Sequence, residues 1–152
     1  MKLTSSAFEQ GGKIPAKYTC DGKNINPPLT ISDVPSETKS LVLIMDDPDV
    51  PKRLRADGMW DHWIVFNMPA NLTKIEEGKE PEGIHGIGTS NNLDYYGPCP
   101  PDREHRYFFK LYALNTQLNL PKKATKPQVE RAMENHILAK TELMGRYERI
   151  KR

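Results

Sequence analysis

A proline-rich loop that leads into an apolar strand constrains this chain more than any other stretch. Residues 97–101, Gly-Pro-Cys-Pro-Pro, place three prolines and a glycine in five positions, which excludes a helix or a central strand there. The aromatic and aliphatic run at 107–114 then predicts a β-strand. The stiff loop delivers His105, Arg106 and Tyr107 to the start of that strand, where binding residues commonly lie. A turn that needs its prolines only for shape is the alternative.

The composition predicts one globular domain over residues 1–152. Apolar residues make up 37% and charged residues 28% of the chain, which is long enough to bury a core. Thirteen prolines and ten glycines indicate many rigid loops, as in a mainly β protein. A net charge of +2 disfavours a nucleic-acid binder, and no apolar run reaches the ~20 residues that a membrane span requires.

The N-terminus and the cysteines bear on the compartment. Residues 1–9 lack the apolar core of a signal peptide, so we expect a cytoplasmic protein. Cys20 and Cys99 allow at most one disulfide, and a cytoplasmic setting favours free thiols. They are too few for a thiolate zinc site, and we expect neither a metal ion nor a cofactor.

Apolar runs and turn signals predict a series of strands. Residues 40–45 include five consecutive apolar residues and predict a strand covered on both faces. Other strands are predicted at 29–34, 60–68 and 107–114, with short ones at 2–9, 18–20 and 72–77.

A capping signature predicts a helix near the C-terminus. Residues 125–128, Thr-Lys-Pro-Gln, combine a capping box with a proline in the first turn. Val129, Met133 and Ile137 then recur at helical spacing, and the pattern continues past Met144. We therefore expect a single helix of about six turns that lies against the sheet.

Three carboxylates follow the buried strand at 40–45. Asp46, Asp47 and Asp49 stand close enough to raise one another's pKa unless cations or hydrogen-bond donors compensate. An extended backbone points Asp47 and Asp49 the same way. The cluster is either part of a functional site or a solvated acidic loop.

Period-two alternation in 60–68 places four side chains on one face of the strand: Trp60, His62, Ile64 and Phe66. A packed, hydrogen-bonded core histidine is the alternative to a functional role for His62.

Several of these groups together suit a small anion: Asp47, His62, His105 and Tyr107. A phosphate favours a protonated imidazole, and Asp47 is suited to accept the second N–H of that imidazolium. Arg106 is suited to offset the charge of Asp49. If His62 must be protonated to hold the anion, affinity falls as pH rises through the pKa of His62.

These segments carry a resemblance to a known family. Residues 47–51 (Asp-Pro-Asp-Val-Pro), 61–63 (Asp-His-Trp), 97–101 and 105–107 (His-Arg-Tyr) resemble the phosphatidylethanolamine-binding proteins, also called Raf kinase inhibitor proteins. Residues 24–29 make the chain similar to the prokaryotic YbhB/YbcL-type branch. The resemblance implies an antiparallel β-sandwich of a large and a small sheet, with a C-terminal α-helix packed at one end.

The resemblance also implies a pocket for phosphate or phosphorylated head groups. Its implied ligand-binding residues are Asp47, Asp49, His62, Cys99, Pro100, His105 and Tyr107. Its implied pocket-shaping residues are Pro48, Pro51, Trp63, Gly97, Pro98, Pro101 and Arg106. The chain departs from the family at residues 102–104, Asp-Arg-Glu, where a glycine is common, so we expect a changed loop there.

Two functional hypotheses follow. The first is non-enzymatic binding of a phosphate- or phosphorylethanolamine-like anion, with possible regulation of a kinase or protease and a possible homodimer, as the resemblance implies. The alternative is a metal-assisted hydrolase built on Asp47, Asp49, His62 and His105, which are acceptable ligand types for zinc. The sequence contains neither an HExxH motif nor a G-x-S-x-G elbow. A purely structural protein leaves the acidic strand end and the histidines unexplained.

Overall fold

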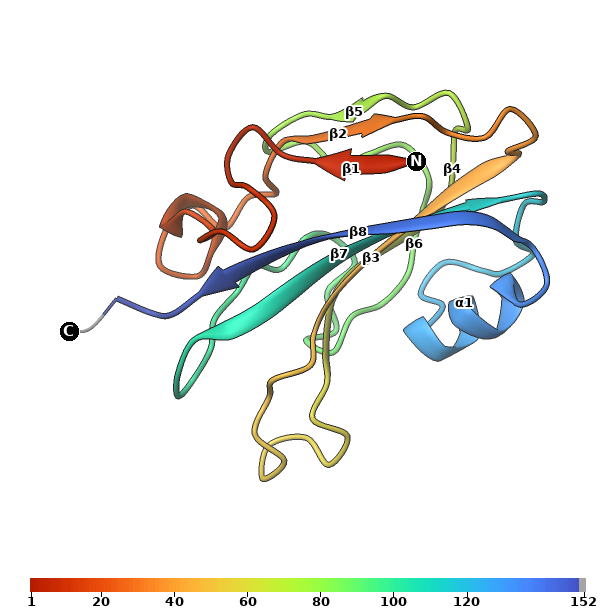
Figure 1. Ribbon diagram of the computed structural model, residues 1–152. Coiled ribbons are helices and arrows are strands. Elements are labelled where there is room, and N and C mark those ends of the chain that lie inside the picture. The colour runs from red at the N-terminus through yellow and green to blue at the C-terminus, as the bar shows by residue number, and fades with distance from the viewer. Residues whose placement is uncertain (151–152) are drawn as a thin grey trace.

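The structure is a computed structural model, and it describes residues 1–150. Within that range the strands form two antiparallel sheets that pack face to face (Figure 1). The smaller sheet has the order β1-β2-β5 and contains β1 (Lys2–Thr4), β2 (Leu29–Ser32) and β5 (Lys74–Ile75). The larger has the order β6-β4-β3-β7-β8 and contains β6 (Ile84–His85), β4 (Trp60–Met68), β3 (Ser40–Asp47), β7 (His105–Leu114) and β8 (Ile137–Tyr147).

A single α-helix among the described residues, α1 (Lys126–Met133), completes the fold. It lies on the face of the large sheet opposite the small sheet, near one end (Figure 1). The predicted fold class, a mainly β antiparallel sandwich with one packed helix, is therefore confirmed. None of the helical segments within residues 1–150 combines the length and the apolarity needed to cross a bilayer.

Strand β3 lies at the centre of the large sheet, and all eight of its residues are buried. Leu41 and Leu43 point into the core between the two sheets, whereas Val42 and Ile44 point into the core beneath α1. Full burial of each such aliphatic side chain contributes about 1.5–3 kcal/mol. The prediction of a strand covered on both faces is confirmed, and this strand fixes where the acidic residues at its end can lie.

The predicted length of the helix is wrong. Thr125 caps α1 through the expected capping box with Gln128, but the helix ends at Met133 and Asn135 follows with φ +67. Such a left-handed residue ends a helix. From Ile137 the chain instead pairs with β7 as strand β8.

The error has a simple geometric cause. Ala139, Leu143 and Tyr147 all face the core between the sheets. Their spacing of four residues is compatible with one face of a helix and also with one face of a strand. The apolar spacing therefore could not decide between the two structures. A smaller error concerns residues 18–20, where the chain forms a 3-10 turn, η1 (Ala16–Tyr18), instead of a strand.

Candidate functional site

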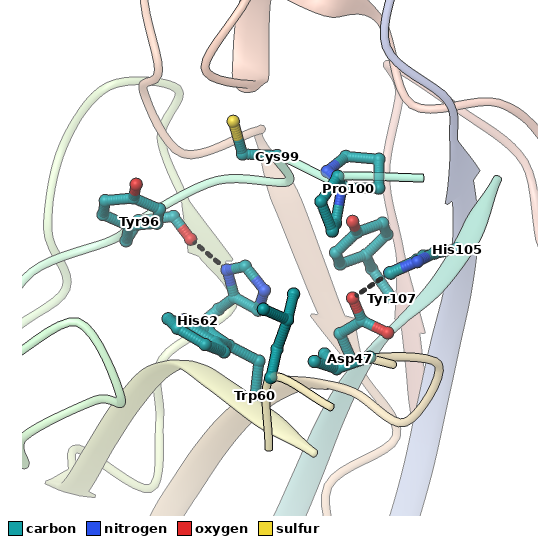
Figure 2. Close-up of a pocket in the computed structure, with 11 residues that line it drawn as sticks. Asp47, Trp60, His62, Tyr96, Cys99, Pro100, His105 and Tyr107 are labelled. Atoms are coloured by element: carbon teal, nitrogen blue, oxygen red, sulfur yellow. Dashed lines mark hydrogen bonds and ion pairs between the residues drawn. The ribbon is translucent and has the colours of Figure 1, made fainter. Parts of the chain in front are cut away.

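A cavity of about 270 Å³ opens where three strands of the large sheet begin or end (Figure 2). Asp47 is the last residue of β3, Trp60 the first of β4 and His105 the first of β7. The cavity is lined by Asp47, Val50, Leu54, Trp60, His62, Tyr96, Cys99, Pro100, Pro101, His105 and Tyr107. Segments far apart in the sequence thus meet around one space.

Most of the residues predicted to bind ligand line this cavity: Asp47, His62, Cys99, Pro100, His105 and Tyr107. Asp49 does not. Sequence reasoning missed Val50, Leu54, Trp60 and Tyr96. The sequence did indicate that Trp60 could line the cavity, because it precedes His62 by two residues in the same strand. Val50 and Leu54 belong to a loop whose path no local sequence pattern predicts.

The three carboxylates at the end of β3 diverge and each finds a cation. The solvated acidic loop considered as an alternative is therefore wrong for Asp46 and Asp47, which are buried. The partners are Lys110 and Lys126 for Asp46, His105 for Asp47 and Arg106 for Asp49.

Asp49 and Arg106 join the loop after β3 to the start of β7. The Asp49 carboxylate accepts hydrogen bonds from the Arg106 guanidinium at 2.8 and 2.9 Å and from the Arg106 backbone N–H at 2.9 Å. The hydrogen bonds from the Arg106 side chain lower the pKa of Asp49. These two residues therefore act on the shape of the rim and not on the cavity interior.

His105 is held between two carboxylates. Its Nδ1 lies 2.6 Å from Asp47 Oδ2 and its Nε2 lies 2.7 Å from Asp102 Oδ1. Burial lowers the pKa of His105, but the hydrogen bonds and charges of Asp47 and Asp102 outweigh it, and the pKa rises above its usual 6.5. Since carboxylates only accept, this geometry suits a doubly protonated imidazolium. Asp102 belongs to residues 102–104, where the chain differs from the family pattern, so this segment contributes to the site.

His62 reaches the cavity through an irregularity in β4. Met45 pairs with Trp63 and Asp46 pairs with Asp61, so His62 is an extra residue opposite β3. A β-bulge of this kind bends the strand and re-aims a side chain.

The predicted alternation along 60–68 is wrong because of this bulge. Ile64 and Phe66 face the core beneath α1, whereas Trp60 and His62 line the cavity, where the His62 ring meets Tyr107 edge-on at 5.3 Å. The four residues expected on one face of the strand are therefore divided between its two sides.

The protonation of His62 differs from that of His105. Its Nδ1 lies 2.6 Å from the Tyr96 carbonyl, which only accepts, so Nδ1 carries a proton. Burial lowers the pKa of His62 and outweighs the Tyr96 carbonyl and the Asp47 charge, which raise it. The ring is neutral, and its other nitrogen faces the cavity as an acceptor (Figure 2). The cavity thus contains one neutral and one charged imidazole, and Asp47 holds His105 and not His62.

The expectation of free thiols is wrong, because Cys20 and Cys99 form a disulfide with a Cα–Cα distance of 5.4 Å. The Tyr95 hydroxyl donates to the Tyr18 carbonyl at 2.7 Å, and the Cys20 N–H donates to the Pro98 carbonyl at 3.1 Å. These bonds align the two segments at a spacing that suits a disulfide. The cytoplasmic location stays a prediction.

Gly97 has a packing role in the same loop. Its N–H donates to Asn24 Oδ1 at 2.8 Å, and a Cβ placed on it would collide with the Tyr18 carbonyl oxygen. Only glycine allows so close an approach of two backbones.

Other predicted shaping residues support the cavity from outside its lining. Pro48 lies in a tight turn closed by the Asp49 N–H, which donates to Asp47 Oδ1 at 2.7 Å. The Pro51 carbonyl accepts from the Leu54 N–H at 2.9 Å and so helps to place that apolar side chain. Trp63 is buried between the sheets, and Pro101 is part of the lining itself.

The four residues of the alternative zinc site do not share a ligand position. Asp49 binds Arg106, and His105 uses different nitrogens for Asp47 and Asp102. Within residues 1–150 these side chains do not gather as a set able to hold an ion. The geometry therefore gives the metal-assisted hydrolase no support at this cavity.

A two-sheet sandwich with a cavity at the strand ends, lined by the Asp, His and Tyr side chains above, defines a class of ligand-binding fold. The chain belongs to the phosphatidylethanolamine-binding protein family, whose model matches residues 4–148. It is 51% identical over 149 residues to a UPF0098 protein of Chlamydia pneumoniae, covering 98% of this chain and 99% of that one. It is 48% identical over 155 residues to a UPF0098 protein of Methanothermobacter thermautotrophicus, with 98% and 99% covered.

Solved structures agree with this assignment. A putative phosphatidylethanolamine-binding protein homolog from Chlamydia trachomatis has a TM-score of 0.95 and 49% identity, with 97% of each chain covered. E. coli YbcL, described as a member of the mammalian family, has a TM-score of 0.87 and 30% identity, with 99% of this chain and 98% of that chain covered. The likeness to the YbhB/YbcL-type branch is therefore confirmed.

Proposed function

We propose that the protein binds a small phosphorylated ligand, such as phosphate or a phosphorylethanolamine-like head group, in the strand-end cavity without transforming it. The observation that carries the proposal is the meeting of Asp47, His62, His105 and Tyr107 around one cavity of about 270 Å³. Apolar walls exclude water, and a few polar groups orient the ligand, as in most small-molecule sites.

The two imidazoles offer complementary bonds to a phosphate. The free nitrogen of His62 accepts a hydrogen bond from a protonated phosphate oxygen. The N–H at His105 Nε2 is suited to donate to a phosphate oxygen, but without ligand it donates to Asp102 Oδ1 at 2.7 Å. The Asp102 side chain is 28% exposed, so it has access to solvent when a phosphate oxygen replaces its carboxylate. Asp47 remains on Nδ1 and keeps the imidazolium neutralised.

The same contacts favour a binding protein over an enzyme. Both nitrogens of His105 are engaged by carboxylates, and Cys99 is held in a disulfide, so neither offers a free base or a nucleophile. Regulation of a kinase or a protease by the loaded protein, as a monomer or a homodimer, is the second part of the proposal. Its support is family membership.

A titration followed by NMR of the imidazole rings tests the first part. Phosphate and phosphorylethanolamine are added separately to the wild type, to His62→Gln and to Asp47→Asn. We expect saturable shifts at His62 and His105 in the wild type, and weaker binding in both variants. His136, a half-buried ring whose Nδ1 lies 2.9 Å from Asn115 Oδ1 and which does not line the cavity, serves as the internal control. Spectra that stay flat up to about 10 mM ligand contradict the proposal.

A further inference from the structure

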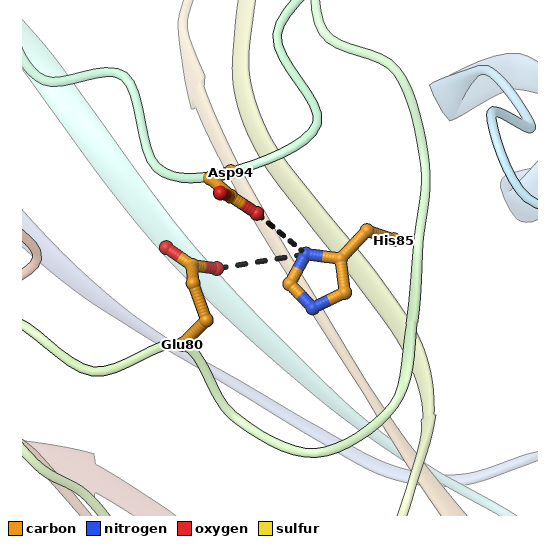
Figure 3. A group of neighbouring side chains, drawn as sticks. All are labelled: Glu80, His85 and Asp94. Carbon is orange, nitrogen blue, oxygen red and sulfur yellow. Dashed lines mark ion pairs between the residues drawn. The ribbon is translucent and has the colours of Figure 1, made fainter.

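Three side chains from separate segments converge in Figure 3, and none of them lines the cavity. Glu80 lies in the connection between β5 and β6, His85 ends β6, and Asp94 lies in the long connection to β7. One ligand atom from each lies within 4.8 Å of the others. Nothing in the proposed function uses this cluster.

The spacing within the cluster is longer than a hydrogen bond. His85 Nδ1 lies 3.5 Å from Glu80 Oε1 and 3.5 Å from Asp94 Oδ1. Zinc binds nitrogen and oxygen at about 2.1 Å, which makes the edge of its coordination tetrahedron about 3.4 Å. Two independent separations therefore match neighbouring ligands of one tetrahedral ion.

Surrounding groups already hold two of the side chains in place. The Glu80 carboxylate accepts from Trp63 Nε1 at 2.8 Å and from the Tyr95 N–H at 3.0 Å. His85 Nε2 lies 3.4 Å from the Pro81 carbonyl. A histidine that ligates a metal through one nitrogen commonly donates its other N–H to such an oxygen.

The charges in the cluster are incompletely balanced without a cation. Across residues 1–150, the ion pairs of Glu80 and Asp94 involve His85 alone, and no lysine or arginine reaches either carboxylate. A divalent ion neutralises the two carboxylates around a neutral imidazole. Imidazole together with carboxylate suits zinc and related transition metals, whereas Mg²⁺ and Ca²⁺ prefer oxygen alone.

We propose that Glu80, His85 and Asp94 form a binding site for a divalent transition-metal ion of the zinc type. His85 Nδ1 donates to the Leu93 carbonyl at 2.9 Å in the metal-free protein. When the ion binds, the single N–H proton of the neutral ring passes through solvent from Nδ1 to Nε2, where it faces the Pro81 carbonyl, and the lone pair freed on Nδ1 binds the ion. Water or the Leu93 carbonyl completes the coordination.

The position of the site gives the ion a structural role. Asp94 lies two residues before Tyr96, whose carbonyl orients His62. The ion ties this segment to Glu80 and β6, and none of its three side-chain ligands lines the cavity. The cluster is open to solvent, because 74% of the Asp94 side chain is exposed, so an ion can enter without unfolding.

Calorimetric titration of EDTA-treated full-length protein with zinc chloride tests the proposal, and thermal unfolding gives a second readout. We expect one ion per chain, a higher Tm with zinc and no effect of Mg²⁺. His85→Gln and Asp94→Asn each weaken zinc binding by roughly tenfold or more. His136→Gln and Glu76→Gln, which alter a half-buried imidazole and an exposed carboxylate elsewhere, leave it unchanged.

Absence of binding at about 1 mM zinc overturns the proposal. So does zinc binding that survives both His85→Gln and Asp94→Asn, or that is lost in His62→Gln instead, because the ion then lies in the cavity. Asp94→Asn alters an exposed side chain, so the test holds even if His85→Gln folds poorly. Phosphate plays no part in the assay, and its outcome is independent of the proposed head-group binding.

Discussion

Removal of the Cys20–Cys99 disulfide should cost a large part of the stability of this protein. The bond joins residues 79 positions apart. In the chain-entropy model the lost entropy is about 2.1 + 1.5R ln n cal/mol/K, which for a loop of this length amounts to about 4.5 kcal/mol at 25 °C. The effect acts on the unfolded chain. The folded loop keeps its hydrogen bonds to Tyr18 and Asn24, so the native structure persists without the bond.

Denaturant unfolding of the oxidised wild type and of the Cys20→Ala/Cys99→Ala variant measures this difference. We expect the variant to be less stable by about 4 kcal/mol, a large share of the 5–15 kcal/mol typical of folded proteins. Reductant should destabilise the wild type and leave the variant unchanged, which is the matched control. Equal unfolding free energies, with mass spectrometry showing an intact disulfide in the wild type, would refute the reasoning.

Four further predictions concern the cavity and the 96–101 loop. Asp102→Asn removes the carboxylate that competes with phosphate for His105 Nε2. Phosphate should therefore bind roughly fivefold more tightly, which is about 1 kcal/mol after screening of this partly exposed group. Equal or weaker binding in calorimetry contradicts this prediction. Gly97→Ala forces a Cβ against the Tyr18 carbonyl and should lower the unfolding free energy by roughly 2 kcal/mol in denaturant melts, and an unchanged midpoint would argue against the close packing. The pKa of His105 is raised in the fold, so its proton stabilises the native state below pH 6.5 and that contribution disappears as pH rises through the folded pKa. The difference in unfolding free energy between the wild type and His105→Asn should therefore shrink with rising pH, and a difference that grows would contradict a raised pKa for His105. The affinity for phosphate should also fall as pH rises, because His105 loses its proton and not because His62 does.

The sequence was sufficient where local chemistry permits one solution. The apolar run of β3 predicted a strand covered on both faces, and the prolines at 97–101 excluded a helix or a central strand there. That Asp47 and His105 share one pocket was a hypothesis that the family resemblance supported. It was insufficient where two structures satisfy the same pattern. Ala139, Leu143 and Tyr147 fit a helix as well as a strand, and pairing with β7 decided the outcome.

Other features depend on contacts between distant segments and leave no local trace. The bulge at His62 is a property of how β4 pairs with β3, and not of β4 alone. The disulfide was mispredicted because compartment was used in place of geometry. The Glu80 cluster combines three segments without any motif spacing.

The division of labour around the cavity limits how such a protein can diverge. Its polar groups stand at strand ends: Asp47 ends β3 and His105 begins β7. Its apolar walls come largely from two connections, at 50–54 and 96–101. Insertions or replacements in those connections can change the shape of the cavity without altering the hydrogen-bonding groups at the strand ends. Relatives that bind different ligands therefore need to share only these strand ends.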